Sequence, residues 1–402
     1  MTWMTVPDES PYGVATLPYG VFGRGDASQV VGVRIGDWAI DLAAVAAELG
    51  HPRAQVFAHP SLNALMALGP ATCSEVRRWV VGLVTDESHR DVVTRHRYDL
   101  AGVTMHLPFD VADYVDFYAS EPHASNVGKI FRPDSPSLPV SWKHLPIGYH
   151  GRAGTVVVSG ADVVRPSGQR RPEPGERPPF GPSVRLDIEC EVGFVVGQPS
   201  SLGTPVCLGE AREHIFGVVL LNDWSARDIQ AWEYVPLGPF LGKSFATSVS
   251  AWVVPLEALV AAEVPLPDQD PAVLPYLSGG ASEAFGLDLH LEVELNGTVV
   301  SRPEYSSMYW SPAQMLAHMT VNGASLRTGD LFASGTVSGT DPESLGSLLE
   351  LTWNGNQPLT LTDGSTRGFL EDGDTVTLRG WAAGPHGRRV TLAEVTGTIR
   401  PA

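Results

Sequence analysis

One continuous apolar run, Ile215 to Leu221, constrains the fold of this chain more than any other segment. Its length and its lack of alternation with polar residues are typical of a strand that is buried on both faces. Asp223 follows almost directly, where the buried strand opens into a loop. Loops on a rigid scaffold are where proteins present functional groups, so Asp223 is the first candidate site residue.

A helical pattern begins at Arg227. Arg227, Gln230 and Tyr234 are spaced three and four residues apart, so they share one face of a helix. Arg and Gln side chains aimed at one point are donors suited to a carboxylate or to a developing oxyanion. A solvated helix face with a scattered charge is the simpler interpretation. Three aromatic residues and a Pro-Leu-Gly-Pro turn in the same segment favour a site.

The composition predicts a β-rich α+β protein with many loops. The chain has 42 glycines and 33 prolines, and turn residues separate many short apolar runs. Its 402 residues leave room for two or three domains. We place a boundary near residue 110, after a linker-like His106 to Phe109, and so expect domains over 1–110 and 111–402. The expected elements of the first domain are strands over 30–35 and 38–42 and helices near 43–49 and 74–84.

Two loop segments are predicted in the second domain. Residues 165–183 contain six prolines and three glycines, which exclude a helix or a central strand. A surface connector is the simpler interpretation of this segment, and an active-site lid is the alternative. Residues 257–285 form another polar insertion rich in Pro and Gly.

Charge and cysteine content exclude several classes of function. A net charge of -18 without any Lys/Arg-rich run argues against nucleic acid as a partner. Cys73, Cys190 and Cys207 show no CxxC spacing, which excludes a disulfide framework and fits a reduced compartment. The sequence has neither an apolar run of transmembrane length nor the pattern of a signal peptide. We therefore expect a cytoplasmic protein that does not engage membranes.

Four acidic residues are candidates for one shared site. Leu186 to Val196 is predicted to be a strand, so Glu189 and Glu191 point to the same face. Exposed antiparallel strands often carry alternating acids, but here the flanks are apolar and Asp223 ends another buried strand. Asp116, in a short segment rich in aromatic residues, is the fourth candidate.

Such a cluster needs neutralisation. Two like charges 4 Å apart repel by about 4 kcal/mol at an effective dielectric constant near 20. Several such pairs would exceed the whole stability of a domain, roughly 5–15 kcal/mol. Either some of these acids are protonated or a cation is bound. A site made only of oxygens selects Mg²⁺, Ca²⁺ or Mn²⁺ over zinc or copper.

His123, seven residues after Asp116, is the best candidate for a general base, because histidine exchanges protons near neutral pH. A lone histidine is more often structural, and its nearness in sequence to Asp116 and Tyr118 raises the odds only modestly. Glu350 stands in an apolar run, where an unpaired acid is costly, so we expect it to pair with a His, Lys or Arg. Tyr149 and Thr336 lie in Gly-rich segments that are either close-approach loops or plain turns.

Several familiar enzyme motifs are absent from the sequence. It contains no G-x-S-x-G, no H-E-x-x-H and no complete G-x-G-x-x-G. These absences disfavour a serine hydrolase, a zinc protease of the HExxH type and a dinucleotide-binding enzyme.

Five segments, taken in order, resemble motifs of the fumarylacetoacetate hydrolase family over nearly the whole chain. They are Asp116-Phe117-Tyr118, Asn126-Val127-Gly128, Pro146 to Arg152, Asn222 to Phe245 and Ser334 to Glu350. The resemblance implies a small SH3-like N-terminal barrel domain and a mixed β-roll or sandwich catalytic domain of the fumarylacetoacetase type. It also implies a homodimer and a divalent cation, Ca²⁺ or Mg²⁺.

The resemblance also implies a role for each matching residue. The metal ligands would be Asp116, Glu189, Glu191 and Asp223, with Lys243 and Thr247 contributing to the metal's surroundings. The base would be His123, oriented by Glu350, and Arg227, Gln230 and Lys243 would stabilise charge on the substrate. Tyr118, Arg132, Tyr149, Tyr234 and Thr336 would hold the carboxylates and the diketone. Arg132 and Thr247 rest on the resemblance alone.

The implied reaction is metal-assisted hydrolysis of the carbon–carbon bond of 4-fumarylacetoacetate to fumarate and acetoacetate, the last step of tyrosine and phenylalanine catabolism. The chain departs from the family at Glu121-Pro122, where we expect Arg-Glu, and at Gly339 to Asp341, which replaces a Gly-Pro-Glu-like turn. The 257–285 insertion also matches poorly. Two rival interpretations are an acylpyruvate hydrolase or related decarboxylase on the same scaffold, and a non-catalytic β-rich module that binds Ca²⁺.

Overall fold

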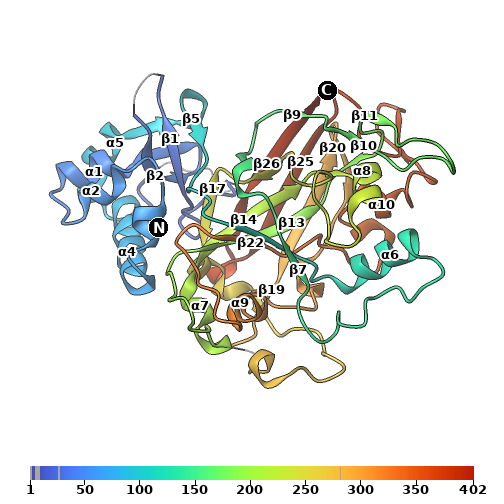
Figure 1. Ribbon diagram of the computed structural model, residues 1–402. Coiled ribbons are helices and arrows are strands. Elements are labelled where there is room, and N and C mark those ends of the chain that lie inside the picture. The colour runs from blue at the N-terminus through green and yellow to red at the C-terminus, as the bar shows by residue number, and fades with distance from the viewer. Residues whose placement is uncertain (1, 5–9, 26–27, 281) are drawn as a thin grey trace.

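The computed structural model describes residues 2–4, 10–25, 28–280 and 282–402 (Figure 1). A mixed sheet of thirteen strands crosses the molecule. Its main path runs in the order β4-β3-β2-β1-β17-β14-β13-β22-β6-β7. Most neighbours are antiparallel, whereas β22–β6 and β16–β8 are parallel. The prediction of a β-rich protein is therefore confirmed.

The N-terminal part combines one end of this sheet with short helices (Figure 1). Its strands are β1 (Tyr19–Gly23), β2 (Val30–Ile35), β3 (Trp38–Asp41), β4 (Arg97–Asp99) and β5 (Thr104–His106). Its α-helices are α1 (Leu42–Glu48), α2 (Ala54–Phe57), α3 (Asn63–Met66), α4 (Pro70–Thr85) and α5 (Arg90–Arg95). The two strands and two helices expected in this region are thus confirmed.

The rest of the large sheet carries the residues of interest. Its strands are β6 (Tyr114–Phe117), β7 (Gly148–His150), β8 (Val156–Val158), β13 (Cys190–Val196), β14 (Ile215–Asp223), β16 (Thr247–Val249), β17 (Trp252–Pro255) and β22 (Leu331–Ala333). β14 contains the apolar run and is buried almost throughout, as predicted. Tyr19 on β1 pairs with Val253 on β17, so the sheet continues across the boundary expected near residue 110.

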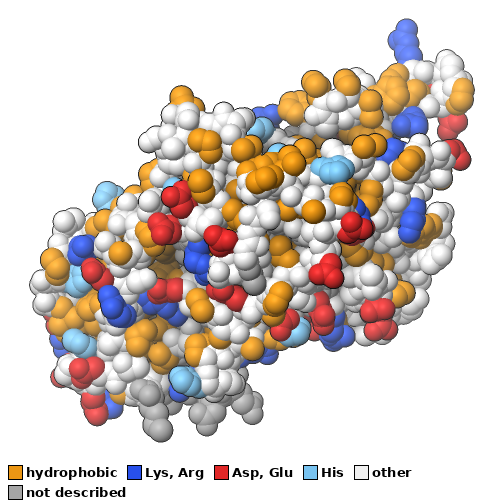
Figure 2. Space-filling model, turned by 90° about the horizontal axis from the view of Figure 1, so that it is seen from below, with side chains coloured by type: hydrophobic (Ala, Val, Ile, Leu, Met, Phe, Trp, Pro, Cys, Tyr) orange, Lys and Arg blue, Asp and Glu red, His pale blue; other side chains and the backbone are white. Residues whose placement is uncertain are grey.

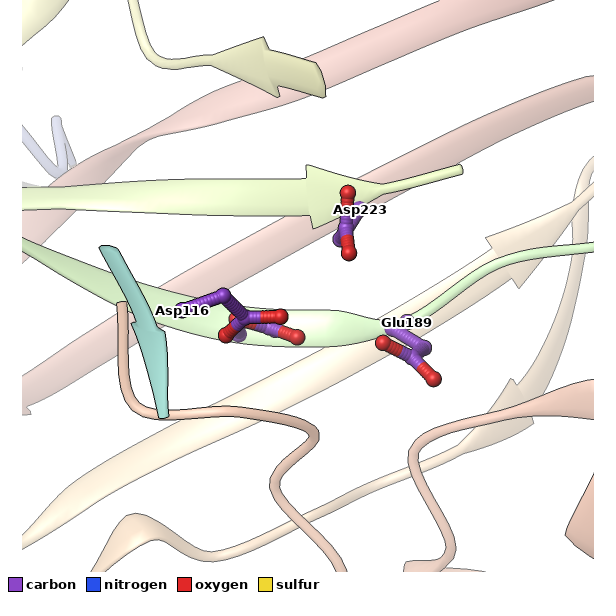
Figure 3. A group of neighbouring side chains, drawn as sticks. Asp116, Glu189 and Asp223 are labelled. Atoms are coloured by element: carbon purple, nitrogen blue, oxygen red, sulfur yellow. The ribbon is translucent and has the colours of Figure 1, made fainter. Parts of the chain in front are cut away.

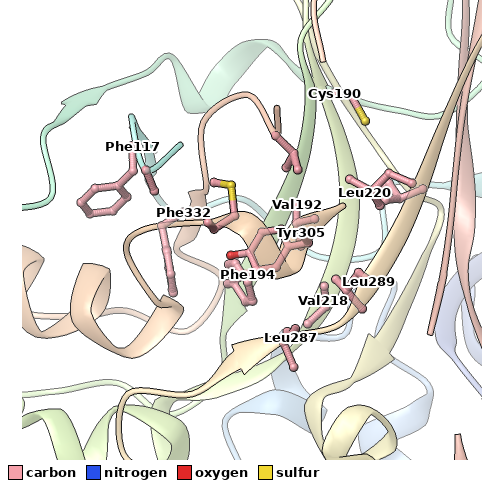
Figure 4. Close-up of a cluster of buried hydrophobic side chains, with 14 of the residues drawn as sticks. Phe117, Cys190, Val192, Phe194, Val218, Leu220, Leu287, Leu289, Tyr305 and Phe332 are labelled. Carbon is pink, nitrogen blue, oxygen red and sulfur yellow. The ribbon is translucent and has the colours of Figure 1, made fainter. Parts of the chain in front are cut away.

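A second sheet packs against the first. Its strands are β21 (Thr298–Ser301), β20 (Leu289–Leu295), β25 (Thr375–Ala383), β26 (Arg389–Arg400) and β9 (Val163–Val164), in that order. At Gly380 of β25 an added Cβ would lie 3.0 Å from the side chain of Leu220 on β14. The core between and beside the sheets includes Phe194, Phe332 and Tyr305 (Figure 4).

Helices in this part flank the sheets. They are α6 (Glu121–Phe131), α7 (Ala211–His214), α8 (Arg227–Glu233), α9 (Pro312–Thr320) and α10 (Leu348–Leu351). Four two-stranded pairs complete the described part: β10 (Ser167–Gln169) with β11 (Phe180–Pro182), β12 (Leu186–Asp187) with β15 (Ser225–Ala226), β18 (Glu263–Val264) with β19 (Gly286–Leu287), and β23 (Leu359–Thr360) with β24 (Thr366–Arg367).

Two expectations about the second domain need comment. The 165–183 segment forms only the hairpin β10–β11, outside the two large sheets, as its prolines require. The single strand expected over 186–196 is wrong, because the strand is interrupted at Ile188 and Glu189, between β12 and β13. The 257–285 insertion is less polar than expected, since Leu277 and Phe285 are buried in the core.

Figure 2 shows one face of the molecule, on which acidic and basic side chains are interspersed with apolar ones. Within the described ranges, no helix combines the length and the apolar character needed to cross a membrane.

Phe194 offers a test of the core. Its ring stacks on Phe332 with the centroids 5.3 Å apart, and it is fully buried. We expect Phe194→Ala to lower the free energy of unfolding by about 3–5 kcal/mol, because the cavity left behind fills only in part. Urea unfolding measures this change. Phe180→Ala, at a side chain that is 75% exposed, is the control and should stay within about 0.5 kcal/mol of the wild type. Equal effects of the two variants would contradict this packing.

Candidate active site

Four carboxylates converge beside the large sheet (Figure 3). Asp116 lies on β6, Glu191 on β13 and Asp223 at the end of β14, while Glu189 directly precedes β13. One oxygen from each residue lies within 4.8 Å of the others, and all four residues are buried. The predicted convergence of these acids is therefore seen, although Glu189 reaches it from outside the strand.

Two cations partly balance these carboxylates. Lys243 Nζ lies 2.8 Å from Asp223 Oδ2 and also pairs with Glu189. Arg227 Nη2 lies 2.8 Å from Glu189 Oε1. Two hydroxyls add hydrogen bonds, since Thr247 donates to Asp223 Oδ1 at 3.0 Å and Tyr149 donates to Asp223 Oδ2 at 3.1 Å.

The balance is uneven among the four acids. Burial raises the pKa of Asp116 and of Glu191 well above the usual range, and the neighbouring carboxylates raise both further. Burial opposes the ionisation of Glu189 too, but Lys243 and Arg227 outweigh it and hold the pKa of Glu189 below its usual value. Burial also raises the pKa of Asp223, against the nearby Lys243. Asp116 and Glu191, whose pKa values are raised most clearly, are the two acids with the weakest compensation.

The orphan oxygens of this cluster fit a divalent metal. Among the described residues, Asp116 Oδ1 and both carboxylate oxygens of Glu191 have no hydrogen-bond partner. Buried polar atoms normally have partners, because desolvation without a bond is costly. The converging groups are all carboxylates, which is the donor set of a hard cation such as Ca²⁺ or Mg²⁺. Lys243 cannot be a ligand, because an ammonium has no lone pair.

The candidate base is held by a second acidic group. His123 Nδ1 lies 2.7 Å from Glu350 Oε2, so the predicted pairing of Glu350 with a basic residue is confirmed. Glu350 also accepts from Asn126 at 3.0 Å, Ser338 at 2.9 Å and Ser347 at 2.8 Å. Burial raises the pKa of Glu350, but His123 and the hydrogen bonds from Asn126 and Ser347 outweigh it and leave the pKa lowered.

Helix α6 fixes the place of His123. Ser120 caps the helix and accepts a hydrogen bond from His123 N at 3.3 Å. Pro122 lies in the first turn, where a missing N–H costs nothing. The departure from the family at Glu121-Pro122 therefore leaves His123 against Glu350. Its other ring nitrogen, Nε2, lies 3.9 Å from Glu189 Oε1.

A cavity of about 420 Å³ joins these groups. The predicted site residues that line it are Asp116, Tyr118, His123, Arg132, Tyr149, Glu189, Arg227, Gln230, Tyr234, Lys243 and Thr336. Asp223 and Thr247 instead line a neighbouring hollow of about 290 Å³, which shares Tyr149 and Lys243 with the first. Glu191 and Glu350 line neither hollow, and both are buried.

The donors of the cavity are arranged along α8 and its surroundings. Arg227 Nη1 donates to Gln230 Oε1 at 3.1 Å, which confirms that the two side chains share a helix face. Thr336 Oγ1 has no hydrogen-bond partner among the described residues, so its hydroxyl is available to hydrogen-bond to a bound molecule. The ring of Tyr118 meets that of His123 edge-on, with centroids 5.5 Å apart.

Four residues that contact the predicted site residues were not themselves predicted. Asp187 pairs with Arg227, and the other three, Asn126, Ser338 and Ser347, donate hydrogen bonds to Glu350. Asp187 lies two residues before Glu189 in the same acidic pattern, so its position was visible in the sequence. Asn126 is three residues after His123, on the same face of a helix. The two serines carried no signal that distinguishes them from other turn residues.

Two protein-family models match the chain. The model of the fumarylacetoacetate (FAA) hydrolase C-terminal region matches residues 113–395, and that of the fumarylacetoacetase N-terminal region matches residues 15–108. This chain belongs to the fumarylacetoacetase family.

Curated members of the family are similar over the full length. Fumarylacetoacetase of Homo sapiens is 46% identical over 418 residues, which cover 100% of this chain and 99% of the human protein. Fumarylacetoacetase of Arabidopsis thaliana is 43% identical over 418 residues, with 100% and 98% covered.

Solved structures share the fold at much lower identity. A fumarylacetoacetate hydrolase from Exiguobacterium antarcticum superposes with a TM-score of 0.56 at 15% identity, covering 96% of this chain and 100% of that one. Maleylpyruvate hydrolase from Sphingobium sp. SYK-6 gives 0.53 at 16% identity, with the same coverage. The fumarylacetoacetase-family chain therefore has the family fold, with mixed β-sheets and an N-terminal domain.

A substitution of Glu191 distinguishes cation binding from the stability of the cation-free protein. We expect Glu191→Gln to melt at or above the wild-type temperature in chelator, because the amide removes the cost of burying an acid whose pKa is raised by burial and by the neighbouring carboxylates. In the wild type, Ca²⁺ or Mg²⁺ at a concentration 100 times its dissociation constant should raise the free energy of unfolding by about 2.7 kcal/mol. The Glu191→Gln variant should lose most of this stabilisation. Thermal melting with and without metal measures both effects. Glu173→Gln, in the exposed loop, should keep the gain, and an undiminished gain in Glu191→Gln would exclude it as a ligand.

Proposed function

We propose that this fumarylacetoacetase-family protein hydrolyses 4-fumarylacetoacetate to fumarate and acetoacetate, the last step of tyrosine and phenylalanine catabolism. One observation carries the proposal: a single cavity is lined by a histidine held by a carboxylate, by three donor side chains and by two acids of the buried cluster. A module that only binds Ca²⁺ would need the acids but not His123, Arg227, Gln230 and Lys243 around one cavity. The full-length similarity to proteins named fumarylacetoacetase supports the substrate.

His123 is the general base in this proposal. Glu350 occupies Nδ1, which leaves Nε2 to take a proton from water as the water attacks the carbonyl carbon. The three further hydrogen bonds to Glu350 hold the carboxylate, and hence the imidazole, in one orientation. The proton on Nε2 is then available to the carbanion that leaves, so that acetoacetate departs protonated on carbon.

Arg227, Gln230 and Lys243 stabilise the charge that develops on the substrate oxygens. They are buried or half-buried, and all line the cavity. A fixed donor of this kind is typically worth about 3 kcal/mol in the transition state. A divalent cation held by Asp116, Glu189, Glu191 and Asp223 supplies Lewis acidity toward the diketone. Lys243 and Thr247 contribute to this cation site by holding Asp223.

The cavity walls favour a diketo dicarboxylate. Tyr118, Arg132, Tyr149, Tyr234 and Thr336 are the proposed substrate-binding residues. Arg132 adds a cation beyond those paired with the acidic cluster, as a second carboxylate requires. An acylpyruvate with a simple alkyl acyl group has one carboxylate fewer, and Arg132 would have no carboxylate to bind in it.

The finer architecture belongs to the same proposal. We propose an SH3-like barrel domain over 1–110 and a β-roll or sandwich catalytic domain over 111–402. The limits of the two family models, residue 108 and residue 113, support this boundary. We also propose a homodimer in the cytoplasm, with Ca²⁺, Mg²⁺ or Mn²⁺ as the cation. The three free cysteines are consistent with a reduced compartment.

His123 gives the test of the reaction. We expect His123→Ala to lower kcat by about 10²–10⁴-fold, the range for loss of a general base, while metal still raises its melting temperature as in the wild type. The readout is loss of fumarylacetoacetate absorbance, with fumarate and acetoacetate counted as products in equal amounts. His144→Ala, at an exposed histidine, is the control. Retained turnover in His123→Ala would remove it from the base role, and wild-type turnover of acylpyruvates alone would overturn the substrate.

A further inference from the structure

Asp187 is a buried acid that lies behind the site rather than in it. Its side chain is 0% exposed, and it is not among the residues that line the cavity. It belongs to the short strand β12, opposite Ser225 of β15. The mechanism above gives it no role, although it lies two residues from Glu189.

Both oxygens of Asp187 are fully used. Oδ2 accepts from Arg227 Nε at 2.8 Å and from Leu349 N at 3.0 Å. Oδ1 accepts from Leu348 N at 2.8 Å and from Ile188 N at 2.7 Å. One carboxylate therefore touches two separate parts of the protein, the guanidinium of Arg227 and the start of α10.

The contact with Arg227 sets the direction of its guanidinium. Because the group is planar and rigid, fixing the Nε edge fixes where both Nη atoms point. Nη1 reaches Gln230 at 3.1 Å and Nη2 reaches Glu189 at 2.8 Å, and all three side chains line the cavity. Asp187 thus holds the Nε side of the Arg227 guanidinium, and Arg227 itself lines the cavity.

The contact with α10 sets the position of Glu350. Leu348 and Leu349 begin this helix, and their N–H groups have no partner within it. Asp187 accepts from both, and Glu350 is the next residue along the chain. Ser347 caps the same turn and donates to Glu350 Oε2, which in turn pairs with His123.

We propose that Asp187 is a positioning residue that holds Arg227 and the Glu350–His123 pair in one fixed arrangement. Arg227 and His123 are far apart in sequence. Arg227 binds Asp187 directly, and His123 is linked to it through Glu350 and the first residues of α10. Since a misplacement of 1 Å in such a site costs about 100-fold in rate, a shared buried anchor serves the chemistry directly. The inference rests on the proposed function.

A second buried aspartate offers a matched control. Asp374 accepts from Arg367 Nε at 2.9 Å, from Glu371 N at 2.7 Å and from Asn296 Nδ2 at 2.7 Å. It is buried as Asp187 is, and none of these residues lines the cavity. Both Asp187→Asn and Asp374→Asn lose the ion pair of a buried aspartate with an arginine, but only the first loses an anchor of the site.

We expect both variants to melt at a lower temperature than the wild type. At a temperature where circular dichroism shows both folded, Asp187→Asn should lower kcat by about 100-fold, and Asp374→Asn should keep the wild-type kcat. The metal-induced rise in melting temperature should persist in both, because neither residue belongs to the acidic cluster. Equal kcat values in the two folded variants would overturn the inference.

A double-mutant test with Arg227 distinguishes a positioning role of Asp187 from a general loss of structure in the variant. In an Arg227→Gln background, Asp187→Asn should lower kcat by clearly less than in the wild type, because one of its two routes to the chemistry is already gone. A full and independent loss would contradict the inference. Wild-type protein that turns over no fumarylacetoacetate would instead overturn the proposed function, and so the two failures are distinguishable.

Asp187→Glu covers the case in which Asp187→Asn does not fold. It keeps the charge and the pairing with Arg227 but moves the carboxylate oxygens by one methylene. We expect a loss of kcat of about 10-fold or more relative to Asp374→Glu, because geometry rather than charge is what Asp187 supplies. A kcat equal to that of Asp374→Glu would overturn the inference.

Discussion

The repulsion among four buried carboxylates governs the rest of this structure. Asp116, Glu189, Glu191 and Asp223 share a space less than 5 Å across with Lys243 and Arg227 as the nearby cations. Arg227 is also paired with Asp187, so negative charge remains in excess. At about 4 kcal/mol per close pair, this excess is tolerable only when a cation or protons neutralise it, and the orphan oxygens of Glu191 mark where a cation would bind.

The fold supplies the rigidity that such a cluster needs. Strands β6, β13 and β14 deliver three of the acids from one continuous sheet, and the second sheet covers it. Short helices carry the side chains that surround the cluster. The proposed base His123 lies on α6, Arg227 and Gln230 lie on α8, and Glu350 lies on α10. A helix can place a side chain precisely only when its end is anchored, which is why Ser120, Ser347 and Asp187 matter to the chemistry.

Local patterns predicted much of this arrangement. The apolar run of β14, the helix that begins at Arg227 and two strands of the N-terminal part, β2 and β3, follow from local sequence patterns alone. The roles of Arg132 and Thr247 depended on resemblance, because no local pattern distinguishes them. The break before β13 and the anchoring by Asp187, Ser338 and Ser347 arise from contacts between distant segments. Such contacts leave no periodic signal, and the same is true of the pairing between β1 and β17 that joins the two parts of the sheet.

The most direct test of this account is the metal dependence of turnover. Purified protein is assayed for loss of fumarylacetoacetate absorbance as isolated, after chelation, and after Ca²⁺ or Mg²⁺ is restored. The account predicts that chelation stops the loss and that metal restores it. A bound cation would neutralise the buried acids and would supply Lewis acidity toward the diketone. Undiminished turnover in metal-free protein would contradict the central claim.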